Sequence, residues 1–512
     1  MKRLYFLILF MALAATSQAQ NDERALAAAI DTIVRIYNER DIVDGFVEEI
    51  FQKHNRSAYL ATRIAKSYYN YNENPESKMR DFHRKDTVQA FKYIRRSLAI
   101  DPKYAQAYVL ASDIISYENG SEGRQEAMNW LNRGIAMNPQ DSALYLASAA
   151  MLAFTDEAAA VAKLEELRKQ DPTFPVDLEL GRMYYRIFDH GGSAEERYAF
   201  IEKIAQYYGK ADKGMLTKGD LGAYAMALQF TNNFSECYEV TTYALAKYPD
   251  DFGLNQFFLS SAVRMKKYDE SIAAAQKLMK IDKEHMSALD YIRYGAALNG
   301  VKKYAEAIEQ YNYVLTMESA TDRNKSDANN QINNTIVDMC SEHVKMGEYA
   351  EAFSLYEKFI AERKAAGHLD AYLMGMYARA YIELSAEQNG DEKKVSLQKA
   401  SGVYDQMAEM FPDRQVFALF SQFNIQTQLD PESEQGLAKP YADKLIDLIL
   451  KQSDWSADAP KLQTAYYYLT YYNFIKRNYK EAISYADKLL DIQPGHPQAE
   501  KIKEISKKYA RR

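Results

Sequence analysis

Aromatic and small residues recur along the chain in a pattern that predicts paired helices. The pattern is an aromatic residue, any residue, glutamate and then a small residue. Because the aromatic ring packs back on the preceding helix and the small residue lets two helices cross closely, each copy predicts the start of a second helix. The glutamate then lies in the first turn, at the positive end of the helix dipole. Copies are Phe234-Ser235-Glu236-Cys237, Tyr268-Asp269-Glu270-Ser271, Tyr304-Ala305-Glu306-Ala307, Tyr349-Ala350-Glu351-Ala352 and Tyr479-Lys480-Glu481-Ala482.

A second pattern, a polar residue followed by proline, predicts where these helix pairs end, because proline cannot continue a helix. Pro139 follows Pro102 by 37 residues, and Pro172 follows Pro139 by 33. One helix pair cannot bury its apolar face alone, so we expect the pairs to stack on one another. The segments are Ile100-Asp101-Pro102, Met137-Asn138-Pro139, Gln170-Asp171-Pro172, Tyr248-Pro249, Phe411-Pro412 and Gln493-Pro494.

Together these patterns resemble the tetratricopeptide repeat, a helix–turn–helix unit of about 34 residues. One unit carries the matching residues Tyr291, Tyr294, Gly295, Leu298, Ala307 and Tyr311, and the last carries Tyr466, Leu469, Ala482, Ala486, Leu489 and Pro494. Tyrosine or aliphatic residues replace the tryptophan of the repeat. The resemblance implies an all-α, right-handed α-solenoid of about eleven such helix pairs, in which the N-terminal units diverge.

We expect four parts along the chain: a signal peptide at 1–19, N-terminal capping helices at 20–57, the solenoid at 58–496 and a C-terminal capping helix at 497–512. The final helix is charged, as a solenoid end must be to stay in solution. Polar insertions should interrupt the repeats. Those at 70–85, 385–395 and 427–437 should separate the two helices of one unit, and 318–332 should separate two units.

The first residues have the features of an export signal. Lys2 and Arg3 precede the apolar run from Leu4 to Ala15, and Ser17-Gln18-Ala19 places small residues where a signal peptidase reads. We expect cleavage after Ala19 and a periplasmic or secreted protein; a peripheral position at the outer membrane stays open. An uncleaved anchor is the alternative. No later stretch is apolar enough to span a bilayer, so we expect no membrane insertion of the mature chain.

The net charge excludes one class of partner, and the two cysteines are predicted to be structural. Removing Lys2 and Arg3 from the 64 basic residues leaves 62 against 71 acidic ones, a net charge of −9. A nucleic-acid partner is excluded on this ground, since it requires a basic surface. Cys237 and Cys340 occupy small-residue positions of the predicted helices, and we expect both to be buried, unpaired thiols.

The sequence carries no recognisable catalytic or metal-binding motif. None of the seven histidines lies three or four residues from another, and there is no H-E-x-x-H, G-x-S-x-G or phosphate-binding glycine loop. We interpret Asp189-His190-Gly191-Gly192 as a turn between helices. We therefore predict no enzyme, no cofactor and no metal. A helical-toroid glycosidase stays open as an alternative, because its carboxylates would converge from distant helices.

The resemblance also implies a binding surface, because proteins of this kind bind partners on the concave face of their first helices. Such a mixed polar and aromatic surface suits an extended peptide or the edge of a folded protein. Tyr467 and Tyr471 have a second interpretation, as rings packed on the neighbouring unit. The repeat register places on this face Asp113, Tyr117, Arg182, Tyr185, Arg186, Gln229, Phe230, Arg379, Glu383, Gln422, Gln426, Tyr467 and Tyr471.

The function predicted from the sequence is a protein-binding scaffold or adaptor in the cell envelope, with one or more proteins as partners. The alternative is a glycan-binding helical protein of an outer-membrane nutrient-uptake system. Such proteins bind sugars on tryptophan rings, and this chain has only Trp130 and Trp455.

Overall fold

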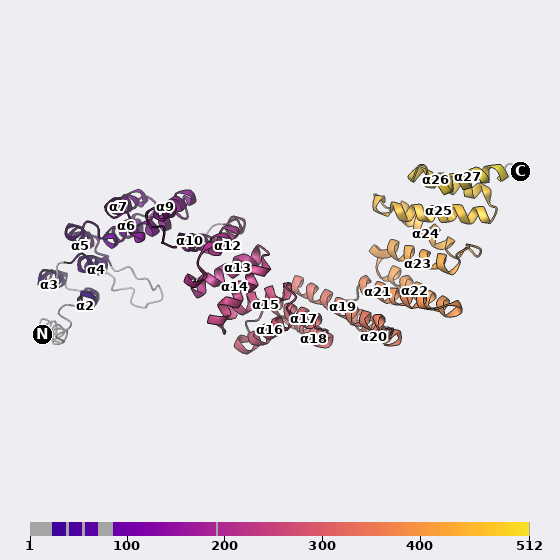
Figure 1. Cartoon of the computed structure of the whole chain (residues 1–512), viewed down its shortest axis with the longest axis horizontal. Coiled ribbons are helices and arrows are strands. Elements are labelled where there is room, and N and C mark those ends of the chain that lie inside the picture. Colours follow the sequence, from indigo (N-terminus) through magenta and orange to yellow (C-terminus); the bar gives the residue numbers. More distant parts are fainter. Residues whose placement is uncertain (1–22, 37–39, 54–56, 70–84, 191–192, 511–512) are drawn as a thin grey trace. The chain divides into compact units, whose positions relative to one another are not determined.

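The computed structural model describes residues 23–36, 40–53, 57–69, 85–190 and 193–510. Within these ranges the chain forms helices joined by short turns, and no strand occurs. It divides into two compact units, one ending at Pro249 and the other beginning at Asp250 (Figure 1). The predicted signal peptide and almost all of the predicted insertion at 70–85 lie outside the described residues.

The first unit contains five successive helix pairs, preceded by α2 and α3. Helix α4 packs on α5, α6 on α7, α8 on α9, α10 on α12, and α13 on α14. The helices are α2 (Glu23–Ile36), α3 (Arg40–Lys53), α4 (Ala58–Tyr69), α5 (Thr87–Ile100), α6 (Ala105–Asn119), α7 (Arg124–Met137), α8 (Ser142–Leu152), α9 (Glu157–Gln170), α10 (Val176–His190), α11 (Ala194–Tyr198), α12 (Ile201–Lys210), α13 (Lys218–Phe230) and α14 (Phe234–Lys247).

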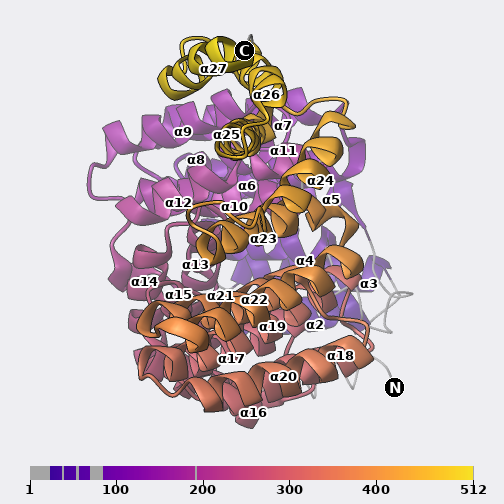
Figure 2. The same ribbon diagram turned by 90° about the vertical axis from the view of Figure 1, so that its right-hand side faces the viewer.

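The second unit contains six further pairs, from α15 with α16 to α25 with α26, and α27 packs on α26. Figure 2 shows one pair, α21 and α22, side by side. The described residues thus confirm the predicted eleven pairs. The helices are α15 (Phe252–Arg264), α16 (Tyr268–Asp282), α17 (Ala288–Gly300), α18 (Tyr304–Thr316), α19 (Asp322–Lys345), α20 (Tyr349–Ala365), α21 (Ala371–Glu387), α22 (Gly390–Met410), α23 (Gln415–Leu429), α24 (Lys439–Leu450), α25 (Ala459–Ile475), α26 (Tyr479–Ile492) and α27 (Pro497–Ala510).

The turn inside five of these pairs has one conformation. In each, the residue two positions before the aromatic residue has a positive φ, and these residues are Asn232, Lys266, Lys302, Gly347 and Arg477. The next N–H then donates back to a carbonyl of the first helix, as from Lys303 to Leu298 at 2.9 Å. This hydrogen bond closes the first helix and reverses the chain into the second.

Small residues lie where the two helices of a pair cross. Cys237, Ser271, Ala307, Ala352 and Ala482, the small residues of the recurring pattern, are all fully buried. On the facing helix, a Cβ added to Gly295 would stand 2.5 Å from the Tyr311 ring. The predicted register of the pairs is therefore confirmed.

Two of the predicted polar insertions are wrong. Helix α19 begins at Asp322, so the polar stretch 318–332 is mostly helix: Thr321 caps it, and Ala328 and Ile332 bury an apolar face. Helix α22 begins at Gly390, only three residues after α21 ends at Glu387. In both segments the polar residues form the exposed sides of long helices, so polarity alone does not predict a loop there.

The predicted insertion at 427–437 is confirmed in large part as a loop, which follows the end of α23 at Leu429. The buried Asp430 carboxylate accepts hydrogen bonds from the backbone N–H groups of Gln435, Gly436 and Leu437. One acidic side chain thus closes the loop on itself.

Candidate functional site

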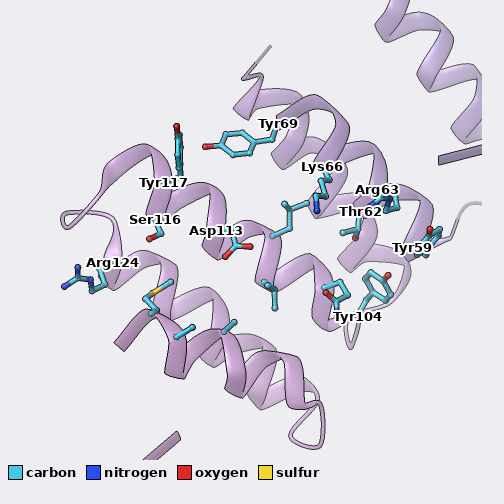
Figure 3. A pocket seen from close by; sticks show the side chains of 16 residues that line it. Tyr59, Thr62, Arg63, Lys66, Tyr69, Tyr104, Asp113, Ser116, Tyr117 and Arg124 are labelled. Atoms are coloured by element: carbon cyan, nitrogen blue, oxygen red, sulfur yellow. The ribbon is translucent and has the colours of Figure 1, made fainter. Parts of the chain in front are cut away.

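A groove of about 980 Å³ runs across the first helices of three successive pairs in the first unit. Its walls are α4, α6 and α8, and Arg124 at the start of α7 lies at one end (Figure 3). Helix α6 contacts both α4 and α8, so the three helices form one continuous surface. The lining residues are Tyr59, Thr62, Arg63, Lys66, Tyr69, Tyr104, Gln106, Val109, Leu110, Asp113, Ser116, Tyr117, Arg124, Ala147, Ala150 and Met151.

Tyrosines stand at both ends of this N-terminal groove. Tyr59 and Tyr104 lie at one end, and Tyr69 and Tyr117 lie toward the other (Figure 3). The Tyr69 hydroxyl donates to Glu118 at 2.7 Å, and its ring meets the Tyr117 ring edge-on at 6.3 Å. The Tyr117 side chain is still about half exposed, so its ring offers a contact surface that is already positioned.

The charged residues of the groove are mainly basic. Lys66 of α4 and Asp113 of α6 point into the space between these helices, and Arg63 stands one turn from Lys66 (Figure 3). The surrounding groove partly desolvates the Asp113 carboxyl and so raises its pKa, whereas the positive charge of Lys66 lowers that pKa. With Arg124, the lining residues include three cations and one carboxylate.

Sequence reasoning placed only part of this groove. Asp113 and Tyr117 were predicted on the binding face and do line it. Tyr59, Arg63 and Lys66 were missed, because the register was not extended to the diverged helix α4. The spacing of Arg63, Lys66 and Tyr59 along one side of a predicted helix was the available signal.

A second groove, of about 750 Å³, lies between α21 and α23 in the second unit. Its exposed rings are Tyr372 and Phe417, each about half exposed. The predicted residue Arg379 lines it and pairs with Glu383 at 2.9 Å, and Arg414 pairs with Asp413 at 3.2 Å. The remaining lining residues are Leu369, Asp370, Ala371, Gly375, Met376, Tyr404, Met407 and Phe411.

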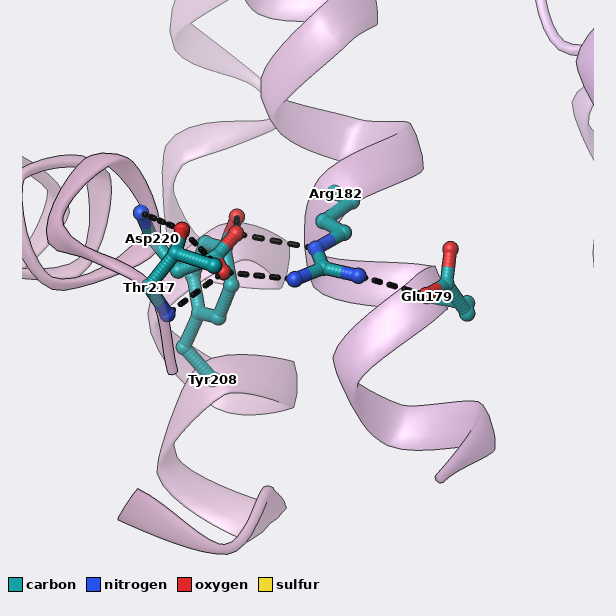
Figure 4. Close-up of polar contacts among 5 residues, drawn as sticks. All are labelled: Glu179, Arg182, Tyr208, Thr217 and Asp220. Atoms are coloured by element: carbon teal, nitrogen blue, oxygen red, sulfur yellow. Dashed lines mark hydrogen bonds and ion pairs between the residues drawn. The ribbon is translucent and has the colours of Figure 1, made fainter. Parts of the chain in front are cut away.

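Arg182 was predicted on the binding face; about a third of its side chain is exposed, but the structure shows that its guanidinium is already engaged by the fold. Its Nε and Nη2 donate to the two carboxylate oxygens of Asp220 at 3.0 and 2.8 Å, and Nη1 donates to Glu179 at 2.7 Å (Figure 4). Asp220 is buried and also accepts hydrogen bonds from Thr217 and Tyr208. Arg182 therefore joins two successive helix pairs and is engaged by the fold.

Gln422 is a second correction, because its side chain is fully buried. Its Nε2 donates to the Ser401 carbonyl at 3.3 Å and to Asp405 at 2.5 Å. Gln422 thus fixes α23 to α22 and cannot contact a partner. The neighbouring predicted residue Gln426 is partly buried and lies beside Ser401.

The other predicted residues are at least partly accessible. Arg186 is exposed, and the partly buried Tyr185 stacks on Phe188 with ring centroids 6.4 Å apart. Phe230 is half exposed and meets the equally exposed Tyr198 ring at 5.7 Å. Tyr467 lies 5.2 Å from the His496 ring, and both Tyr467 and Tyr471 are partly buried. Gln229 is also partly buried.

The described residues hold no group of three or more His, Cys, Asp or Glu side chains placed to bind a metal ion. Cys237 and Cys340 are buried thiols that form no disulfide, as predicted. Burial raises the pKa of the Cys340 thiol to about 12, so it has little thiolate character. None of the helices in the part of the chain that the structure describes combines the length and apolarity needed to cross a membrane.

No family model matches the chain, and no curated protein matches it. Among solved structures, it is similar to the C-terminal part of a TPR repeat-containing protein from Cytophaga hutchinsonii, with 21% identity over 55% of this chain and 98% of that one, at a TM-score of 0.36. It is similar to YrrB, a TPR protein with an unusual peptide-binding site, with 15% identity over 37% of this chain and 92% of that one, at a TM-score of 0.29. It is also similar to PilW, a type IV pilus biogenesis factor, with 14% identity over 53% of this chain and 98% of that one, at a TM-score of 0.22.

These likenesses concern the fold alone. The recurring pattern, the eleven helix pairs and the shared turns of this chain define it as a tetratricopeptide-type solenoid.

Proposed function

We propose that this protein is a binding scaffold or adaptor of the cell envelope and that it holds a segment of a partner protein in the N-terminal groove. One observation carries the proposal: a continuous groove across three successive first helices presents four tyrosines and three cations. Tyrosine and arginine supply much of the binding energy at protein interfaces. Tyrosine also loses little conformational entropy when it is fixed in a complex.

The shape of the groove favours an elongated ligand. Adjacent packed helices lie about 8–10 Å apart, so a segment that crosses from α4 to α8 covers roughly 20 Å. An extended chain rises about 3.3 Å per residue, so about six residues span the groove.

Further contacts are proposed at the other accessible positions of the predicted binding face. They would add contacts outside the N-terminal groove, some in the first unit and some in the second. These residues are Tyr185, Arg186, Phe230, Arg379, Glu383, Tyr467 and Tyr471.

The location in the cell envelope rests on the sequence of residues 1–19, with its basic start, apolar run and Ser17-Gln18-Ala19. N-terminal sequencing of the exported protein should begin at Gln20. A membrane-bound product that retains Met1 would contradict this part of the proposal without affecting the groove.

Neither tryptophan supports the glycan-binding alternative. Trp130 packs against Phe91 and Tyr108, with ring centroids 5.9 and 6.3 Å away, and Trp455 packs on the C-terminal core. Both rings are partly buried by these contacts, so neither presents a fully exposed face of the kind that stacks on sugars.

The decisive experiment is affinity capture from the envelope fraction of the source cells with tagged protein that lacks residues 1–19. The double variant Tyr59→Ala/Tyr104→Ala should lose most of the captured partner, since a single interface tyrosine contributes about 2 kcal/mol or more. Phe154→Ala is the matched control, because that ring is half exposed and lies outside the groove. Equal capture by wild type and the folded double variant would refute the groove as the binding site.

A further inference from the structure

The N-terminal groove has a local charge opposite to that of the whole chain. The full sequence carries a net charge of −7. Arg63, Lys66 and Arg124 line the groove with Asp113 as the only carboxylate among its lining residues, so the lining has a net charge of +2. A basic groove in an acidic chain indicates a ligand of negative charge.

The cations are spaced along the groove. Arg63 and Lys66 lie in the wall formed by α4, whereas Arg124 stands at the start of α7, beyond Asp113 and Ser116 (Figure 3). Lys66 and Asp113 point into the same space between α4 and α6, so the positive charge of Lys66 is opposed there by the Asp113 carboxylate (Figure 3). Arg63 and Arg124 then remain as the two separated positions for acidic groups of a ligand.

The rest of the lining favours a polypeptide over a nucleic acid. Val109, Leu110 and Met151 give part of the groove an apolar surface, and the tyrosines flank it. A phosphate backbone carries charge at every step and binds by neutralisation of many phosphates. Three cations interrupted by the Asp113 carboxylate do not fit that pattern, whereas an acidic peptide offers both carboxylates and apolar side chains.

We infer that the N-terminal groove selects an extended, acidic segment of the partner protein, with carboxylates at the positions of Arg63 and Arg124 and apolar or aromatic side chains between them. This inference rests on the proposed function of the groove and adds the chemistry of its ligand. The negative charge of Asp113 repels an acidic ligand, so this residue limits the affinity of the groove for acidic segments.

The test is fluorescence anisotropy with three labelled synthetic peptides of about eight residues, identical except that the charged positions are Glu, Gln or Lys. The full-length mature protein should bind the Glu peptide most tightly, and added salt should weaken that binding. Arg63→Ala and Arg124→Ala should each weaken it about tenfold to a hundredfold, the loss expected for one charge-assisted hydrogen bond. Asp113→Asn should strengthen it.

Lys169→Ala is the matched control, because Lys169 is exposed on the second helix α9, outside the groove. It should leave the affinity unchanged, and circular dichroism should show that every variant is folded. The inference is overturned if the Gln or Lys peptide binds as tightly as the Glu peptide, if Asp113→Asn weakens binding, or if an oligonucleotide of equal charge competes equally.

The two proposals fail in different ways. If Tyr59→Ala/Tyr104→Ala abolishes capture of the natural partner but the charge variants leave peptide binding unchanged, the groove binds a partner that is not acidic. If the double variant captures the partner as wild type does, the site itself is wrong.

Discussion

Gln256 of α15 donates a hydrogen bond of 2.7 Å to the buried carboxylate of Asp290 in α17, the first helix of the next pair. Arg182 of α10 makes the equivalent contact with Asp220 of α13. In both cases the acid is the third residue of its helix and completes a capping box. A side chain of one first helix thus fixes the start of the next, and this link holds successive pairs in register.

We predict that Arg182→Ala destabilises the protein by about 2–3 kcal/mol, because it leaves the buried Asp220 carboxylate without its cationic partner. Chemical denaturation monitored by circular dichroism measures the change. Arg186→Ala, an exposed residue of the same helix, is the control and should stay within about 0.5 kcal/mol of wild type. A similar result for both variants would show that the Arg182 contact does not stabilise the fold.

The same pair predicts a pH dependence. Burial raises the pKa of Asp220, but the hydrogen bonds from Arg182 and Thr217 outweigh burial and lower it to about 2. The ordinary value is about 4, so the stabilisation is complete above about pH 4 and disappears as the pH falls toward 2. The difference in unfolding free energy between wild type and Arg182→Ala should therefore shrink over this range, and a constant difference would contradict the assignment.

The turn inside each pair predicts a stabilising substitution. Lys266 has φ of +58°, a conformation that costs most residues about 1 kcal/mol but glycine much less. Lys266→Gly should therefore raise the free energy of unfolding by about 0.5–1 kcal/mol. Lys266→Ala removes the same side chain without relieving the backbone, and any gain in that variant would assign the effect to the lost lysine instead.

The crossing point of α17 and α18 predicts an intolerance to larger side chains. Ala307 is fully buried there, so Ala307→Leu should overpack the pair and lower stability by about 1–3 kcal/mol. Ala352→Leu should behave in the same way at the start of α20. Ala361→Leu is the matched control, since Ala361 is exposed on the same helix as Ala352. Thermal melts that show no loss at Ala307 or Ala352 would place the helix crossings elsewhere.

The buried cysteines predict slow thiol chemistry. Cys237 and Cys340 are fully buried, and burial raises the pKa of the Cys340 thiol to about 12. Both should react slowly with a thiol-specific reagent in the native protein and rapidly after unfolding. Fast labelling without denaturant, or a crosslink between the two found by mass spectrometry, would contradict this prediction.

Features that depend on residues close together in the sequence could be predicted, and features that depend on distant residues could not. Ala307, Gly295 and the turn at Lys302 belong to one helix pair, so local sterics and a recurring spacing are enough to reveal them. Local spacing is a poor guide where a helix is mostly polar. The polar stretch 318–332 predicts an insertion between two units, yet most of it belongs to α19, where only Ala328 and Ile332 of its first turns are buried apolar residues.

The sequence by itself therefore determined an all-helical repeat fold, its period, its helix pairs and the burial of both cysteines. The tertiary structure alone decided which polar residues are free to bind. Arg182 and Asp220 lie 38 residues apart, and Gln422 and Asp405 belong to different helices, so only packing shows that these side chains are already engaged. The N-terminal groove likewise appears only when α4, α6 and α8 stack, since no single helix contains its walls.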